Sequence, residues 1–180
     1  SAELPGAMGA YVSEVMFWLY RPLTFMLWGG VFERFPRLKA MVVEGGTMFM
    51  VPSWLMLLDH NYTDIQFSAK LGDFRSHLSM APSEYFARNC GIGASCVPRR
   101  DLDMRDQIGL KQIMWGSDFP HPEGTWPNTA QYYQDTFKGF DVDDGRQILG
   151  GNAIEFYGLD RQYLDGLAAE IGPSSSIFNG

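Results

Sequence analysis

Cysteine, histidine and basic residues are scarce in this chain of 180 residues, which has two cysteines, three histidines and 14 Lys plus Arg against 21 Asp plus Glu. The formal net charge of -7 argues against nucleic acid or an anionic membrane surface as the main partner. Cys90 and Cys96 lack the spacing of a metal knuckle, and no secretory signal precedes them. We therefore predict reduced, buried cysteines and a cytoplasmic setting.

The chain also lacks an uninterrupted apolar run of the length that a membrane span needs. The range 11–31 is rich in large apolar residues, but Glu14, Arg21 and Pro22 interrupt it, and a spanning helix needs about 20 mostly apolar residues. We predict a helix here that Pro22 ends or restarts. Its many aromatic residues favour a subunit interface, so we expect a homo-oligomer through this helical region.

Strand and helix patterns alternate along the rest of the chain. Apolar runs predict strands at 38–44, 83–90 and 112–117, and helical patterns follow at 52–60, 101–110 and 143–157. This order predicts an α/β fold with a parallel sheet in a single domain spanning 1–180. The serine-rich end, 172–180, is expected to be a loose tail.

A carboxylate ends the clearest of these strands. The segment 113–121 reads Ile-Met-Trp-Gly-Ser-Asp-Phe-Pro-His, so Asp118 projects beyond the carboxyl end of a buried strand. Ligands and catalysis are found at that edge of parallel α/β sheets, where a carboxylate can bind a metal or carry a proton. The alternative is that Ser117 and Asp118 make a turn.

A second carboxylate, Glu44, ends the apolar strand that precedes it, before Gly45-Gly46. Because the carboxyl ends of parallel strands share one edge, we expect Glu44 and Asp118 to open onto the same polar mouth. Chance placement of two solvated turn residues is the alternative.

Several motifs, in their order along the chain, resemble the amidohydrolase-related family, whose members include aminocarboxymuconate semialdehyde decarboxylase and γ-resorcylate decarboxylase. They cover roughly residues 30–160 and read Phe-Pro-Arg-Leu-Lys at 35–39, Val-Val-Glu-Gly-Gly at 42–46, Trp-Gly-Ser-Asp-Phe-Pro-His at 115–121 and Ile-Leu-Gly-Gly-Asn-Ala at 148–153. Family members are TIM barrels, and the resemblance implies that this chain is the C-terminal part, about strands six to eight, of a (β/α)8 barrel. A whole barrel takes about 250 residues.

The resemblance also implies a divalent metal ion, zinc or alternatively manganese. In the family a His-x-His or Glu-x-His pair on strand one, a histidine on strand five and an aspartate after strand eight hold the ion. By motif match the aspartate is Asp118. His60, His77 and His121 are widely separated and form no such pair, so the other ligands are expected outside this chain.

The site residues that follow from the resemblance are catalytic Asp118 and Glu44, with Asp118 also the metal ligand. Glu44 stands where the decarboxylases usually carry a histidine acid/base group, and a carboxylate can do the same work. Alternatively, Glu44 ligates the metal or holds a substrate cation. His121 is a candidate substrate contact, or alternatively a hydrogen-bond donor that stabilises its loop. Trp54, with Phe119 and Trp126, is a candidate aromatic wall for a small organic substrate, and the alternative is that these rings belong to the core.

The reaction predicted from these residues is hydrolysis by a metal-activated water, with Asp118 as proton shuttle. One alternative is non-oxidative decarboxylation, in which Asp118 protonates the carbon that loses carbon dioxide. The other is a metal-free half-barrel that acts as an interaction module, which the aromatic-rich first thirty residues motivate.

Overall fold

The centre of the fold is a parallel sheet of three strands, seen in a computed structural model that describes residues 4–45, 48–64 and 69–179. The strands are β1 (Ala40–Val42), β2 (Cys90–Ser95) and β3 (Ile113–Gly116), in the order β1-β2-β3. Ala40 pairs with Cys90, and Ile92 pairs with Ile113. The predicted α/β class and the parallel, adjacent strands are confirmed.

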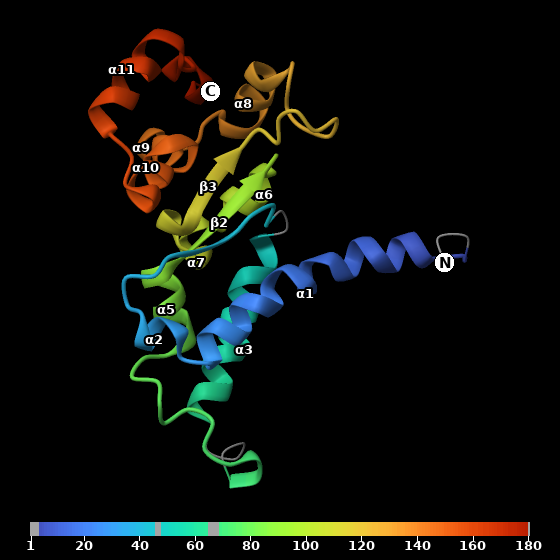
Figure 1. Cartoon of the computed structure of the whole chain (residues 1–180). Helices are drawn as coiled ribbons and strands as arrows, with labels where there is room; N and C mark the ends of the chain where they lie inside the picture. The colour runs from blue at the N-terminus through green and yellow to red at the C-terminus, as the bar shows by residue number, and fades with distance from the viewer. Residues whose placement is uncertain (1–3, 46–47, 65–68, 180) are drawn as a thin grey trace.

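Helices occupy both ends of the molecule (Figure 1). One group, α1, α3 and α5, gathers at the end from which the N-terminus projects, and α8 to α11 lie at the other end. The helices are α1 (Ala7–Trp28), α2 (Val31–Arg34), η1 (Met48–Met50), α3 (Val51–Thr63), α5 (Pro82–Asn89), α6 (Arg99–Leu102), α7 (Arg105–Ile108), η2 (Leu110–Gln112), α8 (Thr129–Phe137), α9 (Val142–Arg146), the π-helix η3 (Gln147–Gly151), α10 (Asn152–Tyr157), α11 (Arg161–Ile171) and η4 (Ser175–Phe178).

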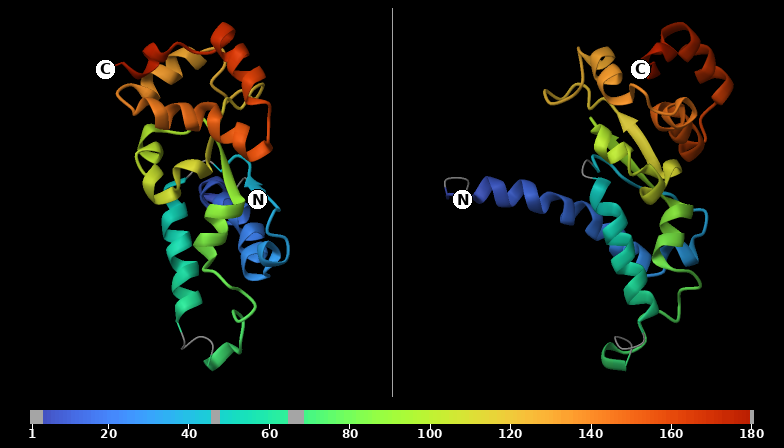
Figure 2. Two further views of the ribbon diagram at one scale, coloured as in Figure 1. Left: turned by 90° about the vertical axis from the view of Figure 1, so that its left-hand side faces the viewer. Right: turned by 180° about the vertical axis from the view of Figure 1, so that it is seen from behind.

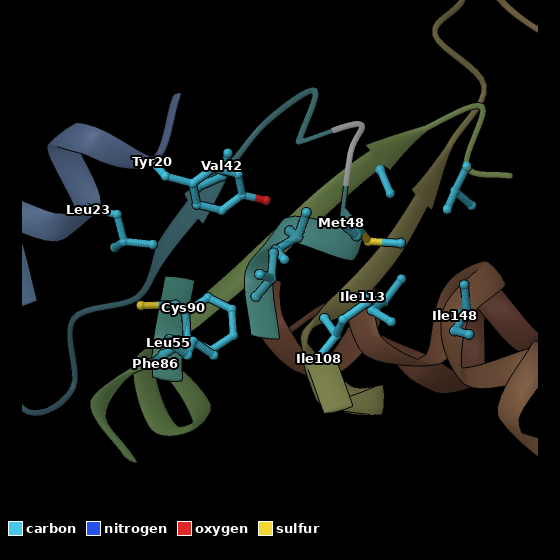
Figure 3. Close-up of a cluster of buried hydrophobic side chains, with 14 of the residues drawn as sticks. Tyr20, Leu23, Val42, Met48, Leu55, Phe86, Cys90, Ile108, Ile113 and Ile148 are labelled. Carbon is cyan, nitrogen blue, oxygen red and sulfur yellow. The ribbon is translucent and has the colours of Figure 1, made fainter. Parts of the chain in front are cut away.

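The hydrophobic core lies on and around the central strand (Figure 3). Ile92 and Ala94 of β2, Ile113 of β3 and Met48 are all 0% exposed. A parallel sheet that is covered on both faces carries a nearly continuous apolar sequence, which is why β3 could be recognised from its Ile-Met-Trp run.

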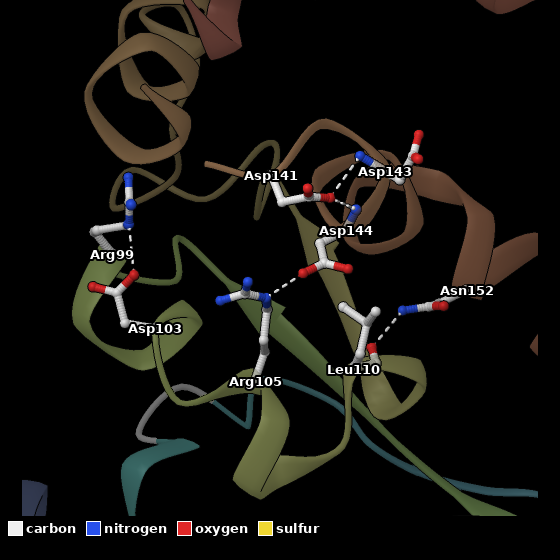
Figure 4. Close-up of polar contacts among 8 residues, drawn as sticks. All are labelled: Arg99, Asp103, Arg105, Leu110, Asp141, Asp143, Asp144 and Asn152. Atoms are coloured by element: carbon white, nitrogen blue, oxygen red, sulfur yellow. Dashed lines mark hydrogen bonds and ion pairs between the residues drawn. The ribbon is translucent and has the colours of Figure 1, made fainter. Parts of the chain in front are cut away.

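Two buried asparagines hold the amino ends of the strands in place. Asn89, just before β2, donates through Nδ2 to the carbonyls of Pro36 (3.0 Å) and Leu38 (2.7 Å). Asn152 of α10 donates in the same way to the carbonyls of Leu110 and Ile113, both at 2.7 Å; the bond to Leu110 is drawn in Figure 4. Side-chain amides thereby satisfy carbonyls near the amino ends of β1 and β3.

The second strand was predicted about six residues too early. The segment expected as a strand at 83–90 is helix α5, and β2 begins at Cys90. Pro82 occupies the first turn, and Glu84 accepts a hydrogen bond from the Ala81 N–H (2.8 Å), which caps the helix. The Pro-Ser-Glu start is a helix signal that the sequence already contained.

Three other expectations change in detail. The helix expected at 101–110 is two short helices, α6 and α7, whereas α1 continues through Pro22. Pro22 is exposed, so the Trp18 carbonyl that its ring leaves without an N–H faces the solvent side. The segment expected to be a loose tail forms η4, where Ile177 and Phe178 are buried and the Phe178 carbonyl accepts a hydrogen bond from Gly139 N–H (2.9 Å).

Among the described residues, no helix combines the length and the apolar character that crossing a membrane requires.

Candidate active site at the carboxyl edge of the sheet

Three residues with left-handed backbone conformations follow the three strands. Glu44 (φ 57°), Cys96 (φ 50°) and Asp118 (φ 61°) are all of the non-glycine residues with positive φ in the described part of the chain. Each comes one or two residues after its strand ends, so parallel pairing brings all three to one edge of the sheet. Such conformations cost about 1–3 kcal/mol each and cluster at functional sites.

Backbone hydrogen bonds extend the strand pairing into these loops. The Gly45 N–H donates to the Gly93 carbonyl (3.0 Å), and the Cys96 N–H donates to the Gly116 carbonyl (3.3 Å). The segments that carry Glu44, Cys96 and Asp118 are therefore tied to neighbouring strands, which is the support that a precisely placed side chain needs.

Asp118 lies within hydrogen-bond distance of the next histidine in its loop. His121 Nδ1 lies 3.1 Å from Asp118 Oδ2 and 3.6 Å from Glu123 Oε2. The Asp118 side chain is 20% exposed and that of His121 is 57% exposed. This pair can accept or deliver a proton beside the sheet edge, and the same contact fits the alternative in which His121 stabilises the loop.

The loop after β3 is folded tightly around Gly124. The Thr125 N–H donates to the Ser117 carbonyl (3.0 Å), and the Gly124 N–H donates to that of His121 (3.0 Å). A Cβ on Gly124 would lie 2.7 Å from the Ser117 oxygen, so a larger residue would push the loop open.

The rings of Phe119 and Trp126 meet edge to face at the base of this loop, with centroids 5.7 Å apart. They are 62% and 66% exposed, respectively. An exposed aromatic pair beside Asp118 fits the expected aromatic wall.

Trp54 lies among the helices and not in the loop after β3. Its ring packs on Tyr20 (5.2 Å between centroids) and Phe86 (5.9 Å), and its Nε1–H donates to Thr24 Oγ1 (3.1 Å). Phe86 belongs to α5, which leads into the amino end of β2. The structure therefore places Trp54 in the helical layer and does not join it to Asp118.

Cys96 is a residue of this edge that the sequence reasoning did not place there. Cys90 is buried as predicted, at 3% exposure, but Cys96 is half-exposed, and its Sγ lies 3.7 Å from the Glu123 carbonyl. Burial, and secondly the negative charge of Asp118, raise the pKa of the Cys96 thiol, so it stays protonated at neutral pH. A correctly placed second strand would have shown that Cys96 follows it as Glu44 and Asp118 follow theirs.

Two hollows in the surface lie away from this edge. One of about 640 Å³ is lined by residues that include Phe25, Trp28 and Phe74, and one of about 820 Å³ lies between α10 and α11. Neither is lined by Glu44, Cys96 or Asp118. These residues of the sheet edge therefore lie outside both hollows.

The donor set of the described residues does not by itself fit a divalent ion. Within residues 4–45, 48–64 and 69–179, no group of three or more His, Cys, Asp or Glu side chains could hold a metal. Asp118 offers a hard oxygen ligand, but catalytic zinc sites use three protein ligands.

Comparison with known proteins decides the family. Residues 18–159 match the family model described as amidohydrolase. The chain belongs to the amidohydrolase family. Both Glu44 and Asp118 fall within the matched range.

Similar proteins of this amidohydrolase family include named decarboxylases. The chain is 29% identical over 141 residues to 2-amino-3-carboxymuconate-6-semialdehyde decarboxylase of Dictyostelium discoideum. The aligned region covers 77% of this chain and 36% of that protein. The structure of 5-carboxyvanillate decarboxylase from Sphingomonas paucimobilis is similar with a TM-score of 0.59 and 28% identity, over 75% of this chain and 38% of that one.

A second similar structure is dihydroxybenzoic acid decarboxylase from Polaromonas sp. JS666, solved with bound manganese and the inhibitor 2-nitroresorcinol. Its TM-score is 0.56 at 22% identity, over 75% of this chain and 38% of that one, so this likeness concerns the fold. The amidohydrolase chain thus spans less than two fifths of the length of each of these three relatives.

Proposed function

We propose that this chain forms about strands six to eight of an amidohydrolase barrel that catalyses non-oxidative decarboxylation of a small organic acid. The supporting observation is that a curated relative at 29% identity and a structure at 28% identity both carry decarboxylase names. The hydrolase predicted from the sequence is the second candidate, and the comparisons favour the carboxy-lyase over it.

Decarboxylation needs a proton at the carbon that loses carbon dioxide. The carbon–carboxylate bond breaks, its electron pair stays on the substrate carbon, and one proton replaces the departing carbon dioxide. Asp118, 3.1 Å from His121 Nδ1, is the proposed proton carrier, and His121 the proposed relay or substrate contact. Phe119 and Trp126 would hold an apolar or aromatic substrate face.

Glu44 is the second proposed acid/base group. It leaves the carboxyl end of β1 as Asp118 leaves that of β3, with β2 between them. A general acid or base contributes about 10²–10⁴-fold to turnover.

A divalent ion, zinc or manganese, remains part of the proposal, with Asp118 as one ligand and the others outside this chain. When bound, such an ion supplies Lewis acidity at the substrate. A small-molecule substrate and a cytoplasmic setting also remain proposals.

The test is turnover in a protein of barrel length that carries this sequence. Carbon dioxide release is measured with 5-carboxyvanillate, dihydroxybenzoate and 2-amino-3-carboxymuconate-6-semialdehyde, and ester and amide hydrolysis is measured in parallel. We expect Asp118→Asn to abolish carbon dioxide release and Glu44→Gln to lower it about 10²–10⁴-fold, because each variant keeps the shape and removes a titratable group.

The matched control is Glu155→Gln, since the Glu155 side chain is 54% exposed and pairs with Arg161 on the surface. Its turnover should equal that of the parent protein. Hydrolysis without decarboxylation would favour the second candidate, and near-parental turnover of Asp118→Asn would remove Asp118 from the mechanism.

A further inference from the structure

Two buried oxygen atoms near the carboxyl edge of the sheet have no hydrogen-bond partner among the described residues. They are the hydroxyl oxygen of Tyr20, on α1, and Oδ2 of Asp101, on α6. The two residues are 6% and 0% exposed, respectively. Buried polar groups are normally paired, either with the protein or with an ordered water. These two atoms therefore call for a partner inside the fold.

The partner has to be small, because both atoms are enclosed by this chain's own side chains. Tyr20 belongs to the hydrophobic core, where its ring packs on that of Trp54 (5.2 Å between centroids). Asp101 is followed by Leu102, which is also 0% exposed. A segment supplied by the rest of a barrel would meet only exposed surface and would not reach either atom.

Both atoms lie close to the loops at the carboxyl edge. A Cβ on Gly45, next to Glu44, would lie 3.3 Å from the Tyr20 hydroxyl oxygen, so this hydroxyl lies directly under the loop after β1. Figure 3 shows the Tyr20 ring reaching from α1 toward the strands. Asp101 follows Cys96 by five residues, in the helix α6 that lies beside the carboxyl tip of β2 (Figure 1).

The two groups are complementary as hydrogen-bond donor and acceptor. Burial, and secondly the negative charge of Asp101, raise the pKa of the Tyr20 hydroxyl, so it keeps its proton and can donate. An ionised carboxylate only accepts, and the other oxygen of Asp101, Oδ1, already accepts from Arg100 Nε (3.3 Å). The Asp101 charge acts on Tyr20, yet the two side chains form no direct hydrogen bond.

We propose that one buried water molecule joins Tyr20 to Asp101 and thereby positions the loops that carry Glu44 and Cys96. The water accepts from the Tyr20 hydroxyl and donates to Asp101 Oδ2, which satisfies both atoms. Buried waters typically bridge groups that would otherwise be unsatisfied. Tyr20 and Asp101 are then positioning residues, because the water holds α1 to α6 beneath the edge. The proposal does not rest on the proposed decarboxylation.

A crystal structure of the 180-residue chain, at a resolution that shows ordered water, tests the bridge itself. We expect one density peak that lies within hydrogen-bond distance, about 2.5–3.0 Å, of both the Tyr20 hydroxyl oxygen and Asp101 Oδ2. An empty gap between the two side chains, or a direct bond between them, would overturn the proposal.

A double-mutant cycle tests whether the two side chains act together. Tyr20→Phe and Asp101→Asn each break the bridge, and we expect each to lower the folding equilibrium constant, measured with urea, about five- to tenfold. The double variant should lose no more than about twofold beyond the larger single effect, because the bridge is already broken. Single effects that multiply would show that the residues act separately. The matched control is Tyr133→Phe, which removes a half-buried hydroxyl of α8 and should change the constant less than about twofold.

Amide hydrogen exchange separates positioning of the edge from general stability, and it needs only the Tyr20→Phe variant. The N–H groups of Gly45 and Cys96 bond to neighbouring strands at the edge, whereas that of Gly139 bonds near the C-terminus. In Tyr20→Phe, exchange at Gly45 and Cys96 should quicken at least about fivefold, and exchange at Gly139 less than about twofold. Equal changes at all three amides would contradict a positioning role for Tyr20.

Discussion

At the scale of single residues, the carboxyl edge is unusual because three side chains there share one backbone conformation. Glu44, Cys96 and Asp118 have φ between 50° and 61°, a region that residues with a Cβ seldom occupy. The cost is offset by the bonds that tie these loops to the sheet, such as Gly45 N–H to the Gly93 carbonyl. The backbone conformation and these hydrogen bonds therefore fix the direction in which the three side chains leave the sheet.

The Cys96 thiol offers a test of this edge that needs no substrate. Burial and the Asp118 charge raise its pKa, so little thiolate exists at pH 7 and iodoacetamide should alkylate it slowly, faster as the pH rises. Asp118→Asn removes the negative charge that disfavours the thiolate, so the pKa falls and alkylation at fixed pH should quicken a few-fold. Mass spectrometry of the digested chain measures the rate at each cysteine.

Cys90 is the internal control, because its burial raises its pKa to about 12 and it should stay unmodified in the folded chain. An unchanged alkylation rate of Cys96 in Asp118→Asn would show that the Asp118 charge does not affect the Cys96 thiol.

At the scale of elements, the opposite edge of the sheet is fixed by side-chain amides. Asn89 and Asn152 are 0% and 2% exposed, and each donates two hydrogen bonds to carbonyls near the start of a neighbouring strand. The Arg105–Asp144 pair adds a tie between α7 and α9 (Figure 4). Side-chain amides thus hold the amino edge of the sheet, whereas backbone hydrogen bonds extend the strand pairing at the carboxyl edge.

Removing the Asn152 amide should loosen β3 from α10. Asn152→Ala leaves the Leu110 and Ile113 carbonyls without their 2.7 Å partners, and each unsatisfied buried group costs about 1–3 kcal/mol. We expect the free energy of unfolding, measured with urea, to fall by about 2–4 kcal/mol. The control is Asn128→Ala at the start of α8, whose side chain makes no capping bond and whose loss should change stability by less than about 0.5 kcal/mol. Equal effects of the two variants would contradict this role of Asn152.

At the scale of the whole molecule, the sheet formed by the described residues is open on both sides. In the order β1-β2-β3, the outer strands β1 and β3 each have one partner, whereas a closed barrel pairs every strand twice. The amidohydrolase relatives are more than twice as long as the matched region. A proposed active site at the carboxyl edge therefore depends on neighbours that this chain does not supply.

Metal binding by the chain alone tests whether the proposed site needs ligands from outside this chain. The described residues contain no group of three ligands, so we expect the chain alone, titrated with Zn²⁺ or Mn²⁺ in a calorimeter, to show no stoichiometric site tighter than about 1 μM. Asp118→Asn should behave identically. One tightly bound equivalent that Asp118→Asn abolishes would mean that this chain holds a complete site.

The local sequence was enough to predict a strand where the apolar run was continuous. The Ile-Met-Trp run gave β3, and the apolar run before Glu44 gave β1. The same logic failed at 83–90, since Tyr85 and Phe86 belong to the buried face of α5, and short apolar segments do not separate helix from strand. The neighbouring Gly-Ile-Gly-Ala segment, with its small residues, gave only a weak strand signal for β2.

The sequence by itself determined the α/β class, the family motifs and the position of Asp118 just beyond the end of β3, because periodicity and motif spacing are local properties of the chain. Tertiary structure alone decided that Cys96 joins the edge and that Trp54 packs among α1 and α5. It also decided that His121 pairs with Asp118 and that one face of α1 stays uncovered. Those outcomes depend on which distant segments meet, and contacts between distant segments are set by packing of the whole core.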